Sequence, residues 1–168
     1  MPTGTFFRLS EEKRGRLIDA AWEEFTRVPY GDVSINRIIQ AAGIPRGSFY
    51  QYFENKKEDL LAYMLEGVAQ FFDDLFTHAL QNAQGDVFAV ILQAYDGLVF
   101  RRNEADENLI RCIKLFRLNP EVIMHNVISQ GPDRFPLSIA AKVDTTGLRQ
   151  RDEAFTRQVC SLLLFALG

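Results

Sequence analysis

Apolar side chains recur every three or four positions along most of the chain, the spacing that places them on one face of an α-helix. Helix is expected to follow helix without intervening strands. Residues 130–136 interrupt the pattern with a glycine and two prolines. Residues 137–148 hold many small and polar side chains, and a short helix with a loop is left open there. The predicted fold class is therefore all-α, with helices over residues 10–28, 34–42, 45–53, 56–82, 87–100, 109–118, 120–129 and from 150 onward. Residues 1–9 are expected to form a loose arm. Asn55 and Glu58 fit a capping box at the start of the helix over residues 56–82, in which the glutamate reaches back to the asparagine.

Two short helices between residues 34 and 53 are predicted to meet at a sharp turn. Ser34 can cap the first helix, because its hydroxyl can accept from free backbone N–H groups. Gly43 can end that helix in the left-handed conformation. Pro45 can begin the next, since its missing N–H would be unpaired there anyway. This order predicts a helix-turn-helix, a frame that many proteins use to read DNA.

The second helix of this pair is predicted to have an inner and an outer side. Phe49 and Phe53 are four residues apart and are expected to face inward with Ile44. Hydroxyl and phenol groups can bond phosphate oxygens, and an arginine near the helix start can reach a guanine edge. Such groups gather towards the helix start or on the predicted outer side, on Arg46, Ser48, Tyr50 and Tyr52. Gly47 lies among them and would let the backbone approach a surface closely.

Residues 17–61 resemble the DNA-binding domain of the TetR family of bacterial transcriptional repressors, and the resemblance extends over about residues 10–66. Three positions depart from the family pattern: Pro29 replaces a usual glycine, Glu24 a usual apolar residue, and Pro45 a usual serine or threonine. The matching residues are Ile18, Asp19, Ala20, Ala21, Phe25, Tyr30, Ser34, Ile38, Ile39, Ala42, Gly43, Ile44, Gly47, Ser48, Phe49, Tyr50, Tyr52, Phe53, Lys56, Leu60 and Leu61.

The resemblance implies a three-helix DNA-binding domain with a helix-turn-helix, residues 1–57. A long helix would join it to a helical ligand-binding and dimerisation domain, residues 58–168. The function implied is that of a ligand-responsive transcriptional regulator, a repressor, which binds a palindromic operator in double-stranded DNA as a homodimer. An unidentified small-molecule inducer would release it.

Carried over by position, the resemblance places DNA contacts at eight residues. Arg46 is expected to contribute most to base reading, and phosphate anchoring is expected from three of the others. Residues 33–57 carry four basic side chains against one acidic side chain, whereas the whole chain has a net charge of −3. DNA affinity would therefore come from a local patch. The eight residues are Ser34, Arg37, Arg46, Gly47, Ser48, Tyr50, Tyr52 and Lys56, of which Ser34, Tyr52 and Lys56 are the expected phosphate anchors.

The middle helices carry many aromatic side chains with a few polar groups among them, a mixture that ligand pockets use. The alternative is that these aromatic side chains only fill the core. Under the family resemblance, the residues predicted to bind the inducer are Phe72, Phe88, Tyr95, Phe116 and His125.

The helix predicted from residue 150 is apolar nearly all round, and a helix of that kind is buried on every side. A second copy of the chain would cover it, so we expect a homodimer. The stop at Gly168 leads us to expect that the natural polypeptide continues. The predicted dimerisation residues are Phe155, Val159, Leu162, Leu163 and Ala166.

Composition narrows the functional classes. Cys112 and Cys160 are far apart and lack metal-ligand spacing, so neither a disulfide framework nor a zinc site is expected. No catalytic motif is found, which predicts no enzyme activity, no cofactor and no metal. No signal peptide or membrane span is evident, so we expect a cytoplasmic protein without a membrane partner. A helical enzyme and a helical protein-interaction module that does not bind DNA stay open as alternatives.

Overall fold

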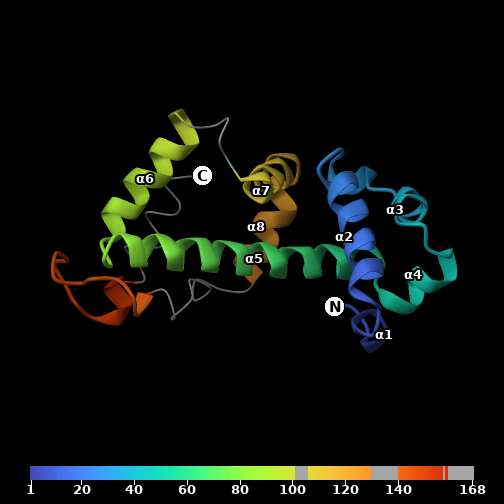
Figure 1. The fold of residues 1–168 in the computed structure, drawn as a ribbon, viewed down its shortest axis with the longest axis horizontal. Helices are drawn as coiled ribbons and strands as arrows, with labels where there is room; N and C mark the ends of the chain where they lie inside the picture. Colours follow the sequence, from blue (N-terminus) through green and yellow to red (C-terminus); the bar gives the residue numbers. More distant parts are fainter. Residues whose placement is uncertain (101–105, 130–139, 157, 159–168) are drawn as a thin grey trace. The chain divides into compact units, whose positions relative to one another are not determined.

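The computed structural model describes residues 1–100, 106–129, 140–156 and 158 (Figure 1). These residues contain helices and turns and no strand, so the prediction of an all-α fold is confirmed. The elements are α1 Gly4–Phe7, α2 Glu11–Phe25, the 3-10 helix η1 Tyr30–Asp32, α3 Ile35–Ala42, α4 Arg46–Tyr52, α5 Lys57–Asn82, α6 Val87–Phe100, α7 Glu107–Leu118 and α8 Pro120–Ser129.

The chain divides into two compact units. Unit 1 comprises Met1–Ala69 and Glu107–Met124, and unit 2 comprises Gln70–Asp106 and His125–Gly168. Helices α5 and α8 each contribute residues to both units. The functional division at residues 57 and 58 stays a prediction.

Helix α2 begins where the sequence predicts. The Ser10 hydroxyl oxygen accepts from the Lys13 backbone N–H at 3.4 Å. Glu11 and Glu12 lie in the first turn, where negative charge interacts favourably with the helix dipole. The buried face of α2 packs against α3 in unit 1, and its apolar residues are Leu17, Ala20, Ala21 and Phe25.

Helices α3 and α4 form the predicted helix-turn-helix. The Ser34 hydroxyl oxygen accepts from the Arg37 backbone N–H, and Gly43 takes the left-handed conformation with φ of 64°. The turn therefore follows from local cap chemistry. Phe49 and Phe53 are fully buried, as predicted. Ile38, on α3, is buried in the same way.

The first nine residues differ from the expectation of a loose arm. Residues Gly4–Phe7 form α1, which packs against α4. The Thr3 backbone N–H donates to the Tyr52 carbonyl oxygen at 2.9 Å. The Phe6 ring is fully buried, with its centroid 5.1 Å from that of Phe53 and 5.0 Å from that of Tyr63. Burial of aromatic surface orders this segment, and the prediction of a mobile arm was wrong.

The start of α5 corrects a second expectation. Glu58 was predicted to reach back to Asn55 in a capping box. Instead, the Asp59 carboxylate accepts from the Asn55 backbone N–H at 3.0 Å and from the Asn55 side-chain amide at 3.3 Å. Lys56 lies between them in the left-handed region, with φ of 51°. This additional bend lets a residue four positions on, rather than three, satisfy the free N–H.

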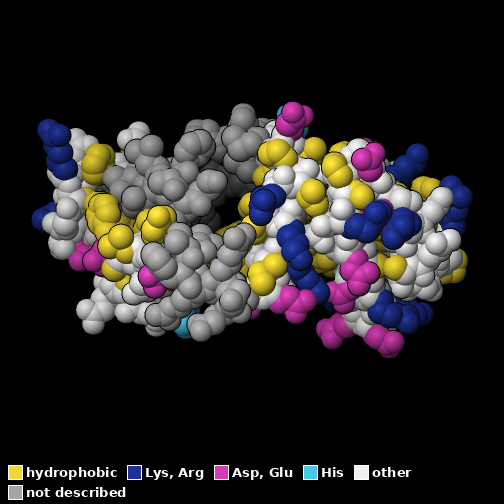
Figure 2. Space-filling view, turned by 90° about the horizontal axis from the view of Figure 1, so that it is seen from above, with side chains coloured by type: hydrophobic (Ala, Val, Ile, Leu, Met, Phe, Trp, Pro, Cys, Tyr) yellow, Lys and Arg dark blue, Asp and Glu magenta, His cyan; other side chains and the backbone are white. Residues whose placement is uncertain are grey.

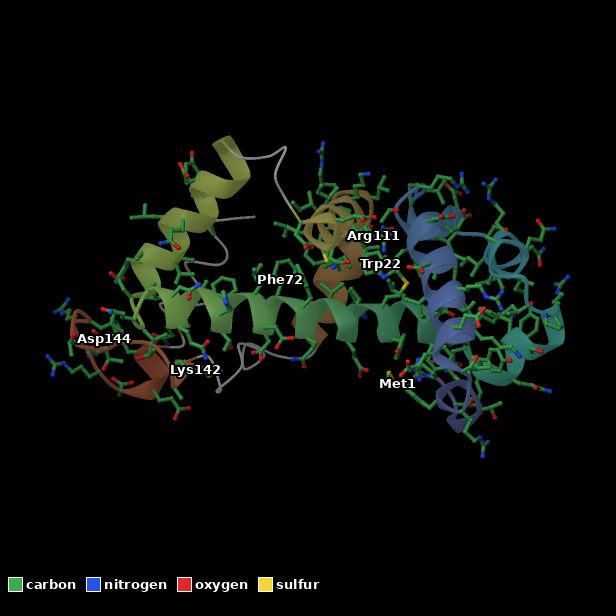
Figure 3. All side chains as sticks on the ribbon, in the orientation of Figure 1. Met1, Trp22, Phe72, Arg111, Lys142 and Asp144 are labelled. Atoms are coloured by element: carbon green, nitrogen blue, oxygen red, sulfur yellow. The ribbon has the colours of Figure 1, made fainter. Side chains whose placement is uncertain are left out.

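Helix α7 joins unit 1 through contacts with segments early in the sequence. Arg111 Nη1 lies 3.5 Å from Asp19 Oδ1, and Figure 3 shows Arg111 pointing toward α2 near Trp22. After α7, the buried Asn119 accepts from the Tyr30 backbone N–H through Oδ1 at 2.6 Å. The same amide donates to the Leu115 carbonyl at 2.9 Å.

Unit 2 has a small apolar core of its own at the α5–α6 turn. Gly85 makes that turn with φ of 87°, and its carbonyl accepts from the Asp144 backbone N–H at 2.8 Å. Lys142 Nζ also donates to the Thr77 hydroxyl, and both Lys142 and Asp144 are labelled in Figure 3. The core residues are Leu80, Val87, Val90 and Val143, with Phe76, Ala79 and Ala83 packed against them.

No helix among the described residues is both long enough and apolar enough to cross a membrane.

Candidate nucleic-acid interface

The outer side of α4 carries most of the side chains predicted to read DNA. Arg46 and Gly47 are exposed at its start, Ser48 is half-buried, and Tyr50 is 38% exposed. The Arg46 guanidinium carbon lies 6.0 Å from the centroid of the Tyr50 ring, a cation–π arrangement. A Cβ at Gly47 would meet no atom within 4 Å, so the backbone here is open to a close approach.

Tyr52 does not lie on the outer side as predicted. Its side chain is only 9% exposed, and its ring centroid is 6.4 Å from that of Phe6 on α1. Tyr52 is three residues beyond the buried Phe49, which places both on the inner side of the helix. Because the N-terminal segment was expected to be mobile, the sequence offered no partner for this ring. Contact of Tyr52 with DNA stays a prediction.

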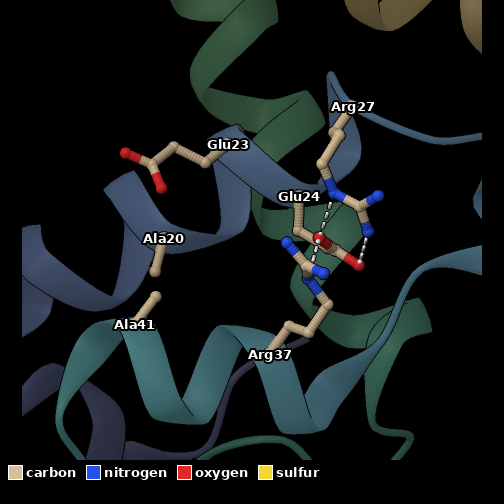
Figure 4. Close-up of a pocket in the computed structure, with 6 residues that line it drawn as sticks. All are labelled: Ala20, Glu23, Glu24, Arg27, Arg37 and Ala41. Atoms are coloured by element: carbon tan, nitrogen blue, oxygen red, sulfur yellow. Dashed lines mark hydrogen bonds and ion pairs between the residues drawn. The ribbon is translucent and has the colours of Figure 1, made fainter.

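The start of α3 is held by a buried carboxylate. Glu24 of α2 is only 4% exposed, and four hydrogen bonds or ion pairs surround it. Figure 4 shows those that Arg27 and Arg37 make. Arg27 donates to it through Nε at 2.9 Å and Nη2 at 2.7 Å. The Ser34 backbone N–H donates to Glu24 Oε1 at 3.0 Å, and Arg37 Nε lies 3.2 Å from Oε2. Two predicted DNA contacts, Ser34 and Arg37, therefore meet at Glu24.

These interactions determine the ionisation of Glu24. Burial by itself would raise the pKa of the carboxyl group. The hydrogen bonds from Arg27 and Ser34, with the charges of Arg27 and Arg37, outweigh burial and lower the pKa below its ordinary value of 4.5. The group is therefore a carboxylate at neutral pH. A shallow pocket of about 110 Å³ opens beside it, lined by Ala20, Glu23, Glu24, Arg27, Arg37 and Ala41.

Lys56, the last of the predicted DNA contacts, is exposed just before α5. Its neighbour Lys57 has a structural role that the sequence did not indicate. Lys57 Nζ donates to the carbonyls of Tyr30 and Gly31 at 3.0 and 3.3 Å. The same ammonium group lies 4.5 Å from the centroid of the Tyr30 ring. The lysine thus ties the start of α5 to the η1 turn.

Tyr30 stands at the centre of this junction. Burial, together with the hydrogen bond and negative charge of Glu58, raises the pKa of its phenol to about 12. Its backbone N–H donates to Asn119, which follows α7. The turn that precedes α3 is therefore fixed from α5 and from the α7–α8 junction, all within unit 1.

Charge on this part of the molecule is mixed. Figure 2 shows Lys and Arg side chains among Asp and Glu side chains, at the end of the view that holds α1 to α4 in Figure 1. In that view there is no continuous basic surface over the described residues. On the face shown in Figure 2, phosphate contacts would therefore have to come from particular side chains rather than from a broad basic surface.

The five residues predicted to bind an inducer belong to different units. Phe116 is in unit 1, and Phe72, Phe88, Tyr95 and His125 are in unit 2. Phe88, Tyr95 and His125 are exposed, and Phe72 and Phe116 are half-buried. Of the five, Phe88 lines a pocket of about 270 Å³ in unit 2. The other lining residues are Asp86, Val87, Asp144, Thr146, Gly147 and Leu148, and the inducer site stays a prediction.

Of the predicted dimerisation residues, the structure describes Phe155 alone. It is half-buried within a helical segment over residues 153–156, where its N–H donates to the Asp152 side chain at 2.9 Å. The other four residues lie outside the described ranges: Val159, Leu162, Leu163 and Ala166.

Among the described residues, no group of three or more His, Cys, Asp or Glu side chains could hold a metal ion. Cys112 is buried and forms no disulfide. The absence of a metal cofactor stays a prediction.

Comparisons with known proteins bear on the same segment. The family described as "Bacterial regulatory proteins, tetR family" matches residues 17–64. The transcriptional regulator AcuR of Cereibacter sphaeroides is 40% identical over 67 residues, which cover 40% of this chain and 28% of AcuR. The uncharacterised HTH-type transcriptional regulator YdgC of Bacillus subtilis is 31% identical over 113 residues, covering 66% of this chain and 56% of YdgC. The matches thus span about a quarter to about half of these curated relatives.

A solved structure is similar over a greater length. The crystal structure of a TetR family transcriptional regulator from Chloroflexus aurantiacus aligns with a TM-score of 0.53 and 30% sequence identity. The alignment covers 99% of this chain and 77% of that protein. With the helix-turn-helix of α3 and α4, and with a family match that includes it, these similarities lead to one conclusion. The chain belongs to the TetR family of bacterial transcriptional regulators.

Proposed function

We propose that this chain is a transcriptional repressor that binds a near-palindromic operator as a homodimer and is released by a small-molecule inducer. The observation that carries the proposal is the exposed outer side of α4. There Arg46, Gly47 and Tyr50 stand open to solvent on a short helix whose inner side is buried. Helix α3 packs against α4, and the turn at Gly43 follows the end of α3. Donor-rich, open surfaces of this kind fit the major groove.

Within this proposal the eight predicted residues have different roles. Arg46, at the start of α4, reads a base edge, because a guanidinium can donate twice to guanine. Lys56 and Ser34 contact phosphate, and so does Arg37 at the start of α3. Because the Tyr52 ring is buried, Tyr52 contacts DNA only where its hydroxyl group reaches the protein surface. Gly47, Ser48 and Tyr50 allow the helix to approach the groove closely.

Two copies of the chain would place two α4 helices in successive major grooves, about 34 to 36 Å apart. The C-terminal residues from Phe155 to Ala166 supply the dimer contact in this proposal. Residues 58–168 also hold the inducer. Release requires the inducer to bind a state with poorly spaced α4 helices more tightly, since equal affinity for both states would shift nothing. The proposed place of action is the cytoplasm.

The proposal is tested with purified chain and a pool of DNA duplexes that carry a randomised central segment. We expect repeated selection to enrich an inverted repeat with half-sites one helical turn apart, and the free protein to sediment as a dimer. Failure to enrich any sequence at low salt would overturn DNA recognition. A monomer that enriches a single unrepeated site would overturn the symmetric arrangement.

Release is tested separately. Compounds that raise the melting temperature of the purified chain are added to its complex with the enriched duplex. We expect such a compound to dissociate the complex in a gel-shift titration. A compound that binds but leaves operator affinity unchanged contradicts inducer release.

A further inference from the structure

We propose that Glu24 is a positioning residue for DNA recognition, whose buried carboxylate holds the first turn of α3 and the side chain of Arg37 in the geometry that specific binding needs. The inference rests on the proposed function and deepens it. Glu24 itself lies inside unit 1 and would not touch DNA.

Glu24 lies next to the fully buried Phe25, and it is 4% exposed. A buried charge is unfavourable unless it is paired and hydrogen-bonded, and a well-packed apolar residue at such a site is often equally stable or more stable. A paired glutamate is therefore not expected to stabilise unit 1 more than a well-packed apolar residue would. What an apolar residue could not supply is the fixed geometry that these contacts impose on α3.

The Glu24 carboxylate connects three segments of unit 1. Its partners come from three places: Arg27 just beyond α2, the Ser34 backbone at the cap of α3, and Arg37 in the first turn of α3. The Ser34 hydroxyl also accepts from the Arg37 backbone N–H at 3.4 Å. One carboxylate therefore joins the end of α2 to both proposed phosphate contacts of α3.

Arg37 is paired with Glu24 and still accessible to solvent. Glu24 lies 3.2 Å from its Nε, while the side chain remains 62% exposed. Arg27 donates two hydrogen bonds to the Glu24 carboxylate in a bidentate arrangement, and Arg37 contributes a single contact. The guanidinium is thus held at one edge, and much of it faces solvent. A side chain ordered in advance loses less conformational entropy when it binds.

These contacts have two opposite effects on DNA binding. The negative charge of Glu24 weakens the general attraction between unit 1 and phosphate, which dominates non-specific binding. The ordering of Ser34 and Arg37 strengthens binding only where phosphates stand in the right register. Removal of the charge should therefore lower specific affinity without lowering non-specific affinity. Simple unfolding would lower both.

The test compares Glu24→Gln with Glu23→Gln. Glu23 is the adjacent residue on α2 and lines the same shallow pocket, but it is exposed, so its substitution removes the same charge without disturbing the contacts. Both variants are titrated with the duplex that wild-type chain enriches from a random pool and with a shuffled duplex of equal length. For Glu24→Gln we expect a loss of about ten-fold on the enriched duplex. On the shuffled duplex we expect no loss relative to Glu23→Gln.

Equal behaviour of the two variants on both duplexes would overturn the inference. So would a loss for Glu24→Gln that is the same on the enriched and the shuffled duplex. If wild-type chain enriches no duplex at all, the proposed function fails instead, and the two failures are thereby distinguished.

A second variant covers the case in which Glu24→Gln does not fold. Arg37→Gln changes an exposed side chain on α3. We expect it to weaken binding to the enriched duplex and to reduce the salt dependence of binding by about one phosphate contact. Where Glu24→Gln does fold, the losses in the double variant should be far from additive, because both substitutions act through one contact. Wild-type affinity and salt dependence in Arg37→Gln would overturn the inference.

Discussion

The side-chain oxygen of Asn119 accepts a hydrogen bond from the backbone nitrogen of Tyr30 at 2.6 Å, across 89 positions of sequence. Asn119 follows α7, and Tyr30 begins the turn that leads into α3. Because the other end of the amide donates to the Leu115 carbonyl, both polar ends of this buried side chain are satisfied. The helix-turn-helix is thereby attached to a helix from the second half of the chain.

Replacement of Asn119 by alanine should destabilise unit 1. The substitution leaves the Tyr30 N–H without its acceptor, and an unsatisfied buried donor costs about 1 to 3 kcal/mol. The free energy of unfolding in urea measures the effect. Glu121→Ala, at an exposed position on α8, serves as the control and should change stability little. Equal stability of the two variants would contradict a structural role for the Asn119 contact.

Arg46→Ala should weaken binding to the enriched operator by about 1 to 3 kcal/mol and relax the sequence preference at one position. The reason is the loss of a guanidinium that stands exposed at the start of α4. Gel-shift titration and repeated selection with the variant measure the two effects. Lys114→Ala removes an equal charge from an exposed position on α7 and should leave the sequence preference as it was. An interaction module or an enzyme without DNA binding would lose no function in Arg46→Ala.

Acid should remove a stabilising contribution of Glu24. The pKa of its carboxyl group is lowered in the folded chain and near the ordinary 4.5 in the unfolded chain. As pH falls, the unfolded chain therefore takes up the proton first. The stabilising contribution of Glu24 is complete above about pH 4.5, and it is lost as pH falls through the pKa of Glu24 in the folded chain. The free energy of unfolding, measured in urea at a series of pH values, should fall less steeply on the acid side for Glu24→Gln than for wild-type chain. An identical fall on the acid side in wild-type chain and variant would refute this linkage.

Gly85→Ala should destabilise unit 2. Gly85 has φ of 87°, and an added Cβ would lie 2.9 Å from the Asp144 backbone nitrogen. The left-handed conformation alone costs a residue with a side chain about 1 to 2 kcal/mol, and the close contact adds to it. Gly67→Ala is the control, because Gly67 lies in α5 with open space around it and alanine favours helix there by up to about 1 kcal/mol. The midpoint temperature of thermal unfolding should fall for Gly85→Ala and rise for Gly67→Ala.

Much of unit 1 could be predicted from sequence because its signals are local. Ser34 and Gly43 act on backbone groups within a few residues of themselves, so cap chemistry located both ends of α3. The spacing of Phe49 and Phe53 identified the inner side of α4 in the same way. Tyr52 failed that reasoning, because its burial depends on Phe6, which lies 46 positions earlier in the chain.

The sequence alone determined most of the helical segments, α1 excepted, and also where the helix-turn-helix lies and which family pattern it follows, since periodicity and caps are properties of neighbouring residues. Only the tertiary structure decided what covers each face and which charges meet. Glu24 stood out in sequence merely as a departure from an apolar position, whereas the fold brings Arg27, Ser34 and Arg37 around it. An ion pair or a buried amide depends on distance in space. Helical period tells which side of a helix is apolar, but not which distant residue will pack against it.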